Sequence, residues 1–285
     1  MTLIPEDAQV GFVGLGNLGQ PMARALLRDG WQVTVLDRDP AKAEPCRADG
    51  AQVAASPADL AACDVVAIAV PDDTAVRQVL DGLFGALRRG AAVVVHSTVL
   101  PATAVELAAE AERRGLLWVD APVSGGAERA LDGDLTVMVG ADPDALAATR
   151  RLLAAVGRTV VHVGPPGAGE AVKLANQLVM FAALAGLHEA LELAAANGVG
   201  PDRVLEVLAT GTGDTWVGRN WGFFDRVAVA YDDGGTPVAE RPWRKDLAEV
   251  VAAGGAAGLD LPVAAVLHAT LAARVEEHAH RGRQG

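Results

Sequence analysis

The feature that most constrains the fold is a glycine-rich turn close to the N-terminus. An apolar run, Val10–Val13, reads as a buried strand, and the hexapeptide Gly14-Leu15-Gly16-Asn17-Leu18-Gly19 follows it directly. In a strand–turn–helix unit the first glycine permits a tight turn, the second lets a ligand approach the backbone, and the third lets helix and strand pack closely. The motif therefore predicts a parallel βαβ unit at the start of the chain.

An acidic residue at the end of the next expected strand makes this turn a signal for dinucleotide binding. Asp37 lies at the spacing that the fingerprint requires, and the turn would place a pyrophosphate at a helix N-terminus. Asp37 can accept hydrogen bonds from both ribose hydroxyls of NAD and would repel a 2′-phosphate. Arg38 could pair with that phosphate or stack on adenine. The pattern favours NAD and leaves NADP open. The expected pyrophosphate-binding residues are Gly14, Leu15, Gly16, Asn17, Leu18 and Gly19.

Two different patterns divide the chain into two expected domains. Over residues 1–165 short apolar runs alternate with Ala-rich segments, as is typical of parallel strands covered on both faces. From Ala168 to about Ala196 the pattern is that of one long helix. We predict a Rossmann α/β domain with a doubly wound, mostly parallel sheet at 1–165, joined by this long interdomain helix to an all-α domain at 166–285. The expected strands are Val10–Val13, Val33–Leu36, Val65–Val70, Ala91–His96, Leu117–Asp120, Val137–Val139 and Val160–Val163.

Composition excludes several classes of function. A net charge of −12 and a pI of about 4.9 disfavour nucleic-acid binding. Cys46 and Cys63 form no ligand spacing, so we expect neither a metal site nor a disulfide. The N-terminus has no leader pattern and no apolar run approaches the ~20 residues that span a bilayer. We therefore expect a cytoplasmic protein with no membrane partner.

Two further motifs indicate a reaction beside the dinucleotide. Asp120-Ala121-Pro122-Val123-Ser124-Gly125-Gly126 follows an apolar strand, where small residues expose backbone N–H groups that, with the Ser124 hydroxyl, suit a carboxylate. Lys173 and Asn176 lie three residues apart on the long helix, so both side chains can reach one ligand atom. An amine and an amide on one helix face are suited to proton transfer, and an amine acting as a base at neutral pH requires desolvation that favours its neutral form.

Together these segments resemble the β-hydroxyacid dehydrogenase family, which includes 3-hydroxyisobutyrate dehydrogenases and tartronate semialdehyde reductases. The resemblance extends over nearly the whole chain, and the second domain is similar to the C-terminal domain of 6-phosphogluconate dehydrogenase. Its landmarks are GFVGLGNLGQPMA, VPDDTAV, HSTVLP, DAPVSGG, GAGEAVKLANQ and Lys245-Asp246-Leu247.

The resemblance implies roles at matching positions. Lys173 would relay the proton of the substrate hydroxyl, and Asn176, or Gln177 as in some members, would orient that hydroxyl. The substrate carboxylate would bind at Ser124, Gly125 and Gly126. Residues that would contact the nicotinamide half, or close over it, are Val70, Pro71, Asp72, Thr98 and Lys245. The family uses no metal and assembles as dimers or tetramers through the helical domain.

One segment departs from the family pattern. The residues before Lys245 read Ala239-Glu240-Arg241-Pro242-Trp243-Arg244 rather than alternating apolar side chains. With Trp216, Arg219, Asn220 and Trp221 they could shape an unusual substrate pocket, with Trp216 contacting the substrate, or form a solvated loop. Both interpretations stay open.

The sequence therefore predicts an NAD(P)-dependent oxidoreductase that interconverts a small β-hydroxyacid and its semialdehyde or keto acid, with Lys173 as proton relay. One alternative is an imine reductase, a family that carries Asp or Tyr at the position of Lys173 and lacks the APVSGG loop. The other is a non-catalytic NAD(P)-binding protein, a class that usually loses the lysine.

Overall fold

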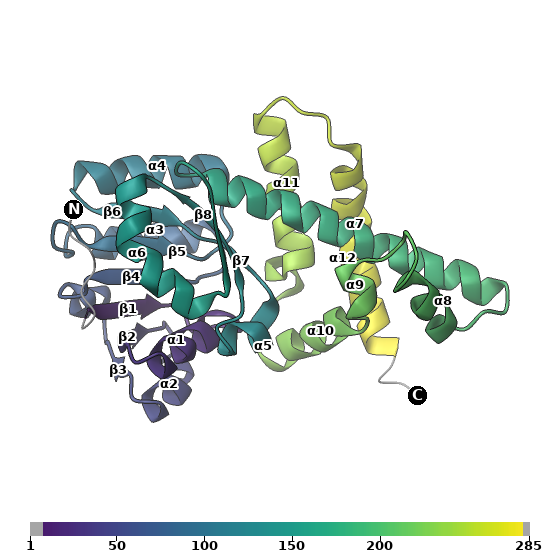
Figure 1. Cartoon of the computed structure of the whole chain (residues 1–285), viewed down its shortest axis with the longest axis horizontal. Coiled ribbons are helices and arrows are strands. Elements are labelled where there is room, and N and C mark those ends of the chain that lie inside the picture. The colour runs from purple at the N-terminus through teal and green to yellow at the C-terminus, as the bar shows by residue number, and fades with distance from the viewer. Residues whose placement is uncertain (1–7, 282–285) are drawn as a thin grey trace. The chain divides into compact units, whose positions relative to one another are not determined.

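The computed structural model describes residues 8–281 and divides the chain into two compact units (Figure 1). The units are Met1–Lys173 and Leu174–Gly285, so the division falls inside the long helix α7 (Ala168–Ala196). The sequence analysis placed the boundary ahead of this helix. The first turn of α7 belongs to the first unit because Asp120, at the end of a strand, accepts the N–H groups of Gly167 and Glu170.

Within the described residues, the first unit is built on a nine-stranded sheet with strand order β3-β2-β1-β4-β5-β6-β8-β7, and β9 pairs with β8. Pairing from β3 to β6 is parallel, β8 is antiparallel to β6 and β7, and β9 is parallel to β8. The strands are β1 (Gln9–Val13), β2 (Gln32–Leu36), β3 (Gln52–Val53), β4 (Val65–Ile68), β5 (Ala92–Val95), β6 (Leu117–Asp120), β7 (Val123–Ser124), β8 (Thr136–Ala141) and β9 (Thr159–Gly164). The doubly wound, mostly parallel sheet is confirmed.

Helices cover both faces of this sheet, which explains why its strands are apolar without alternation. Val94 belongs to the buried cluster that includes α1 and α6, whereas the neighbouring Val93 belongs to the cluster that includes α3 and α4. Ser56 and Asp59 form a capping box at the start of a short 3-10 turn, Pro57–Leu60. The α-helices before α7 are α1 (Gly19–Arg28), α2 (Glu44–Ala48), α3 (Asp73–Leu83), α4 (Pro101–Arg113), α5 (Gly126–Leu131) and α6 (Pro143–Val156).

The second unit is helical throughout its described residues, as the sequence predicts. Its core contains Phe181 of α7 together with Phe224, Trp243 and Leu271 from later helices. Those helices are α8 (Pro201–Leu208), α9 (Trp216–Arg219), α10 (Phe223–Asp233), α11 (Pro242–Ala256) and α12 (Pro262–Arg281).

Helix α7 is long and apolar enough to cross a membrane by length and composition alone. The sequence shows no uninterrupted apolar run of that length because polar residues at 173–177 and again at His188, Glu189 and Glu192 break it, whereas the average hydropathy of the helix remains high. By length and mean hydropathy, the expectation that no segment approaches the length and composition of a membrane span was therefore wrong. One such helix is weak evidence for a membrane span, since the same composition is typical of helices in packed helical domains.

The unusual segment before Lys245 places two side chains, Arg241 and Trp243, in the core, whereas Ala239, Glu240 and Arg244 are exposed. Trp243 is fully buried, and its indole Nε1 donates to Glu276 of α12 at 2.9 Å. The buried Arg241 guanidinium donates to Asp232 of α10 and to Glu276, each at 2.7 Å. Both interpretations of the sequence, a substrate pocket and a solvated loop, are therefore wrong for Arg241 and Trp243. These two side chains join α10, α11 and α12 in the core of the second unit.

Trp243→Ala should destabilise the helical unit by about 3–5 kcal/mol, because it removes the largest fully buried side chain of that core and leaves Glu276 without its indole donor. Urea denaturation followed by far-UV circular dichroism measures the change. Trp216→Ala is the matched control, since the Trp216 side chain is 37% exposed. Equal midpoints for the two variants would contradict this account of the core.

Candidate active site

The glycine turn excludes side chains at two of its glycines and leaves open space at the third. Gly14 has φ +93°, and a Cβ there would lie 2.3 Å from the carbonyl oxygen of Ala69. A Cβ on Gly19 would lie 2.0 Å from the carbonyl oxygen of Gly14, so the helix–strand approach excludes any side chain. A Cβ on the exposed Gly16 would meet no atom within 4 Å. Gly16 thus leaves open backbone at a helix N-terminus, which fits a dinucleotide pyrophosphate.

Asp37 follows β2 and is tied to the same turn. The backbone N–H of Leu15 donates to its Oδ2 at 2.7 Å, and the N–H of Asp39 donates to its Oδ1 at 2.8 Å. A carboxylate has about four acceptor sites, so Asp37 keeps capacity for ribose hydroxyls while it holds the turn. Asn17 and Arg38 are exposed, Leu15 is buried and Leu18 is half-buried.

Two expected cofactor segments are hydrogen-bonded to each other. The N–H of Val70, which follows β4, donates to Ser97 Oγ at 2.8 Å, and Ser97 immediately precedes Thr98. Asp72 of the Val70-Pro71-Asp72 turn caps α3 by accepting from the N–H of Ala75 at 2.8 Å. The structure therefore brings Thr98 and the Val70–Asp72 turn together at the carboxyl edge of the sheet, and the Asp72 carboxylate serves as a helix cap.

The Ser124 loop has a backbone conformation that requires glycine at two consecutive positions. Ser124 ends β7, and Gly125 and Gly126 follow with φ of +145° and +79°, a region that favours glycine. A Cβ on Gly125 would lie 2.8 Å from Leu135 Cδ2. Helix α5 begins at Gly126, so successive N–H groups and the half-buried Ser124 hydroxyl gather at one turn.

Lys173 lies against this loop within the first unit. Its side chain is 7% exposed, and its Nζ donates to the carbonyl oxygen of Val123 at 2.8 Å. Its helix is anchored one turn earlier by Asp120. An ammonium withdrawn from water and placed one residue from Ser124 can stabilise charge that develops on a ligand oxygen.

In the second unit, Asn176 and Gln177 enter a chain of polar contacts with α11. Asn176 Nδ2 donates to Gln177 Oε1 at 3.2 Å, and Gln177 Nε2 donates to Asp246 Oδ2 at 2.5 Å. Lys245 Nζ lies 3.1 Å from Asp246 Oδ1 and 2.8 Å from Glu249 Oε1. Burial alone would lower the pKa of Lys245, but the two carboxylates outweigh it and raise that pKa above its usual value.

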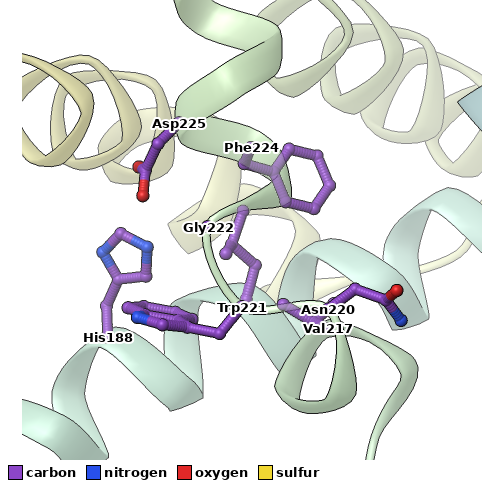
Figure 2. A pocket seen from close by; sticks show the side chains of 8 residues that line it. His188, Val217, Asn220, Trp221, Gly222, Phe224 and Asp225 are labelled. Atoms are coloured by element: carbon purple, nitrogen blue, oxygen red, sulfur yellow. The ribbon is translucent and has the colours of Figure 1, made fainter. Parts of the chain in front are cut away.

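Trp216 lies at the start of α9 and makes an edge-to-face contact with Phe223 at 5.1 Å between ring centroids. Trp221 belongs to a different cluster, with His188 of α7 and His278 of α12, at 5.3 and 5.1 Å. Neither histidine could be predicted as part of a cluster from the sequence, because the two lie far apart in the chain. Figure 2 shows the small pocket between these elements, with Trp221 and Asp225 next to His188. Its volume of about 10 Å³ has room for a single water and not for an organic acid.

One group of side chains in the described part of the chain has metal-ligand spacing. Asp232, Glu276 and His280 offer atoms within 4.8 Å of one another. The Arg241 guanidinium donates to both carboxylates, and His280 Nε2 lies 3.0 Å from Asp232 Oδ2. The positively charged Arg241 guanidinium already pairs with both carboxylates, so it takes the place that a metal cation would have in this group.

The sheet, the glycine turn and the paired helical unit define the class of an NAD(P)-dependent oxidoreductase. Residues 9–164 match the family model described as the NAD binding domain of 6-phosphogluconate dehydrogenase. Residues 167–284 match the model described as NAD-binding of NADP-dependent 3-hydroxyisobutyrate dehydrogenase. The chain belongs to the β-hydroxyacid dehydrogenase family.

Individual relatives agree with this assignment. An uncharacterized oxidoreductase of Mycobacterium tuberculosis is 36% identical over 96% of this chain and 95% of its own length. The NAD-dependent L-serine dehydrogenase of Pseudomonas aeruginosa is 37% identical over 73% of this chain and 71% of its own. The solved structure of M. tuberculosis 3-hydroxyisobutyrate dehydrogenase with L-serine has a TM-score of 0.82 and 30% identity, and 95% of each chain is covered. An imine reductase from Pseudomonas, 22% identical with a TM-score of 0.68, shares the fold alone.

Gly16→Ala should weaken NAD binding at least ~10-fold without lowering the melting temperature, because the added methyl group meets no protein atom but occupies the space of the pyrophosphate. Calorimetric titration with NAD and a thermal melt measure the two effects. Gly85→Ala is the matched control, since a Cβ there also meets no atom within 4 Å. Unchanged affinity in the Gly16 variant would remove this turn from the cofactor site.

Proposed function

We propose that this protein interconverts a small β-hydroxyacid and its semialdehyde or keto acid with NAD(P), and that NAD is the preferred cofactor. The observation that carries the proposal is the position of Lys173, buried in the first unit with its Nζ on the carbonyl of Val123, one residue before the Ser124-Gly125-Gly126 turn. An amine beside an anion-binding turn suits a substrate that has a carboxylate and a nearby oxygen. The preference for NAD rests on the Asp37 carboxylate, which disfavours a 2′-phosphate.

Each residue has a distinct task in the proposed reaction. NAD(P), held by the glycine turn and Asp37, supplies the hydride chemistry when it is bound. Ser124, Gly125 and Gly126 bind the substrate carboxylate, which fixes the distance from the carboxylate to the reacting carbon. Lys173 gives a proton to the substrate oxygen or takes one from it, and Asn176, one helical turn further on, orients that oxygen. Trp216 is a candidate contact for the rest of the substrate.

Activity screening tests the proposal. Purified protein is assayed with 3-hydroxyisobutyrate, L-serine, glycerate, tartronate semialdehyde and succinic semialdehyde, each with NAD(H) and NADP(H). We expect turnover of at least one β-hydroxyacid or semialdehyde, faster with NAD(H). Reduction of a cyclic imine with no turnover of these acids would assign the imine reductase activity instead. Tight cofactor binding without any turnover would indicate a non-catalytic protein.

Lys173→Ala should lower kcat by roughly 10²–10⁴-fold, the usual contribution of a positioned acid or base, while the dissociation constant for NAD changes little. Steady-state kinetics on the best substrate and calorimetric titration with NAD separate the two quantities. Lys42→Ala serves as control because Lys42 is an exposed lysine of the first unit. Wild-type turnover of the Lys173 variant would exclude this side chain from the mechanism.

We also propose that the protein is a homodimer or homotetramer in the cytoplasm. Self-association is supported by apolar side chains that are exposed on the helical unit, among them Val179 and Leu193 of α7 and Val266 of α12. A reducing compartment is supported by Cys46 and Cys63, both free and buried. Val179→Asp should shift the mass measured by light scattering toward the monomer, whereas Val161→Asp, on the exposed face of β9, should leave it unchanged.

A further inference from the structure

The charged side chains buried in the first unit form a small set. Among its described residues they are Asp120, Glu170 and Lys173, each buried and all at the start of α7 or the end of β6. His96, at the end of the neighbouring strand, is also buried, and burial lowers its pKa to about 4, so it is uncharged at neutral pH. Lys173 is thus the one buried cation in this described set.

Glu170 lies one helical turn before Lys173 on the same face of α7. Positions i and i+3 of a helix are neighbours, with Cβ atoms roughly 5–6 Å apart. Glu170 is fully buried, and its Oε2 accepts from the backbone N–H of Val99 at 3.2 Å, directly after Thr98. The carboxylate therefore connects the helix that carries Lys173 to the segment expected to contact the nicotinamide.

The surroundings favour a charged Glu170. It lies in the first turn of α7, where the helix dipole stabilises a carboxylate, and it accepts a backbone N–H. Asp120, the other buried acid, is held by the N–H groups of Gly167 and Glu170, and burial raises its pKa. A buried carboxylate is tolerated when an opposite charge lies nearby, and Lys173 is the buried cation on the same helix face.

We propose that Glu170 is a positioning residue that keeps Lys173 in its ammonium form, so that at neutral pH the free enzyme is set for reduction of a carbonyl substrate. This inference rests on the proposed function. In that direction the carbonyl carbon takes a hydride from NAD(P)H and the carbonyl oxygen takes a proton from Lys173. The neutral amine then regains a proton from water. Oxidation of the hydroxyacid needs the neutral amine at the outset and is therefore favoured at higher pH.

The titration of Lys173 can be observed without any turnover. The chain has three lysines, Lys42, Lys173 and Lys245, so ¹³Cε-labelled lysine gives three NMR signals that Lys42→Arg and Lys245→Arg assign. In the free wild-type protein we expect the Lys173 midpoint to lie no lower than that of the exposed Lys42, in spite of burial. A wild-type Lys173 midpoint below that of Lys42 would overturn the inference whatever any variant does.

Glu170→Gln removes the charge at nearly constant volume and should lower the Lys173 midpoint by at least about one pH unit. Glu170→Asp retains the charge and should keep the midpoint nearer that of the wild type. Glu112→Gln, which removes an exposed carboxylate of the same unit, is the control and should leave it unchanged. Thermal melts establish that each variant is folded. An unchanged midpoint in folded Glu170→Gln would overturn the inference.

The activity measurement separates this inference from the proposed function. In Glu170→Gln the pH profile of kcat/KM for hydroxyacid oxidation should move to lower pH by the same amount as the NMR midpoint. The NMR shift without turnover of any β-hydroxyacid would refute the proposed function and leave the charge pairing intact. Turnover with an unshifted profile would refute the role of Glu170 and leave the proposed function intact.

Discussion

The hydrogen bonds between the Asp120 carboxylate and the beginning of α7 are the interaction on which the candidate site depends. Asp120 ends β6 and accepts from Gly167 and Glu170, so it fixes where α7 starts and how it is rotated. The packing leaves no room for change: a Cβ on Gly140 would lie 2.4 Å from Asp120 Oδ2, and one on Gly169 would lie 2.6 Å from the carbonyl oxygen of Met138. Because Lys173 follows one turn later, the position of its amine derives from this cap.

The other site segments of the first unit lie close to the carboxyl ends of strands, either after a parallel strand or at the short β7. Strands of a doubly wound sheet end at one edge, and the loops beyond them meet there. Hydrogen bonds between these loops, such as Val70 to Ser97 and Leu15 to Asp37, then fix their mutual positions. Much of the polar chemistry in this region therefore holds the loops in place, and the remaining acceptor capacity and open backbone are available to ligands.

The sequence predicted the parallel strands and the bounds of α7 because apolar runs and helical periodicity are local signals. It missed β3 and β7, since each has two residues and no run to detect. It interpreted Arg241 and Trp243 wrongly because their partners, Asp232 and Glu276, lie on other helices and cannot be found by spacing. The capping role of Asp72 was missed for another reason: the residue matched a family motif, and that match concealed its local hydrogen bond to Ala75.

The protonation state of Lys173 is a further property that the sequence alone does not determine. Burial by itself disfavours an ammonium, which leads to the expectation of a neutral amine. The structure adds a second influence on this amine, the buried Glu170 carboxylate on the same helix face, which the backbone N–H of Val99 holds in place. Lys245 is an example of a buried lysine whose pKa is raised because two adjacent carboxylates, Asp246 and Glu249, outweigh desolvation. The role that we propose for Glu170 is the same, and it would make the residue one turn before the lysine part of the proton-transfer site.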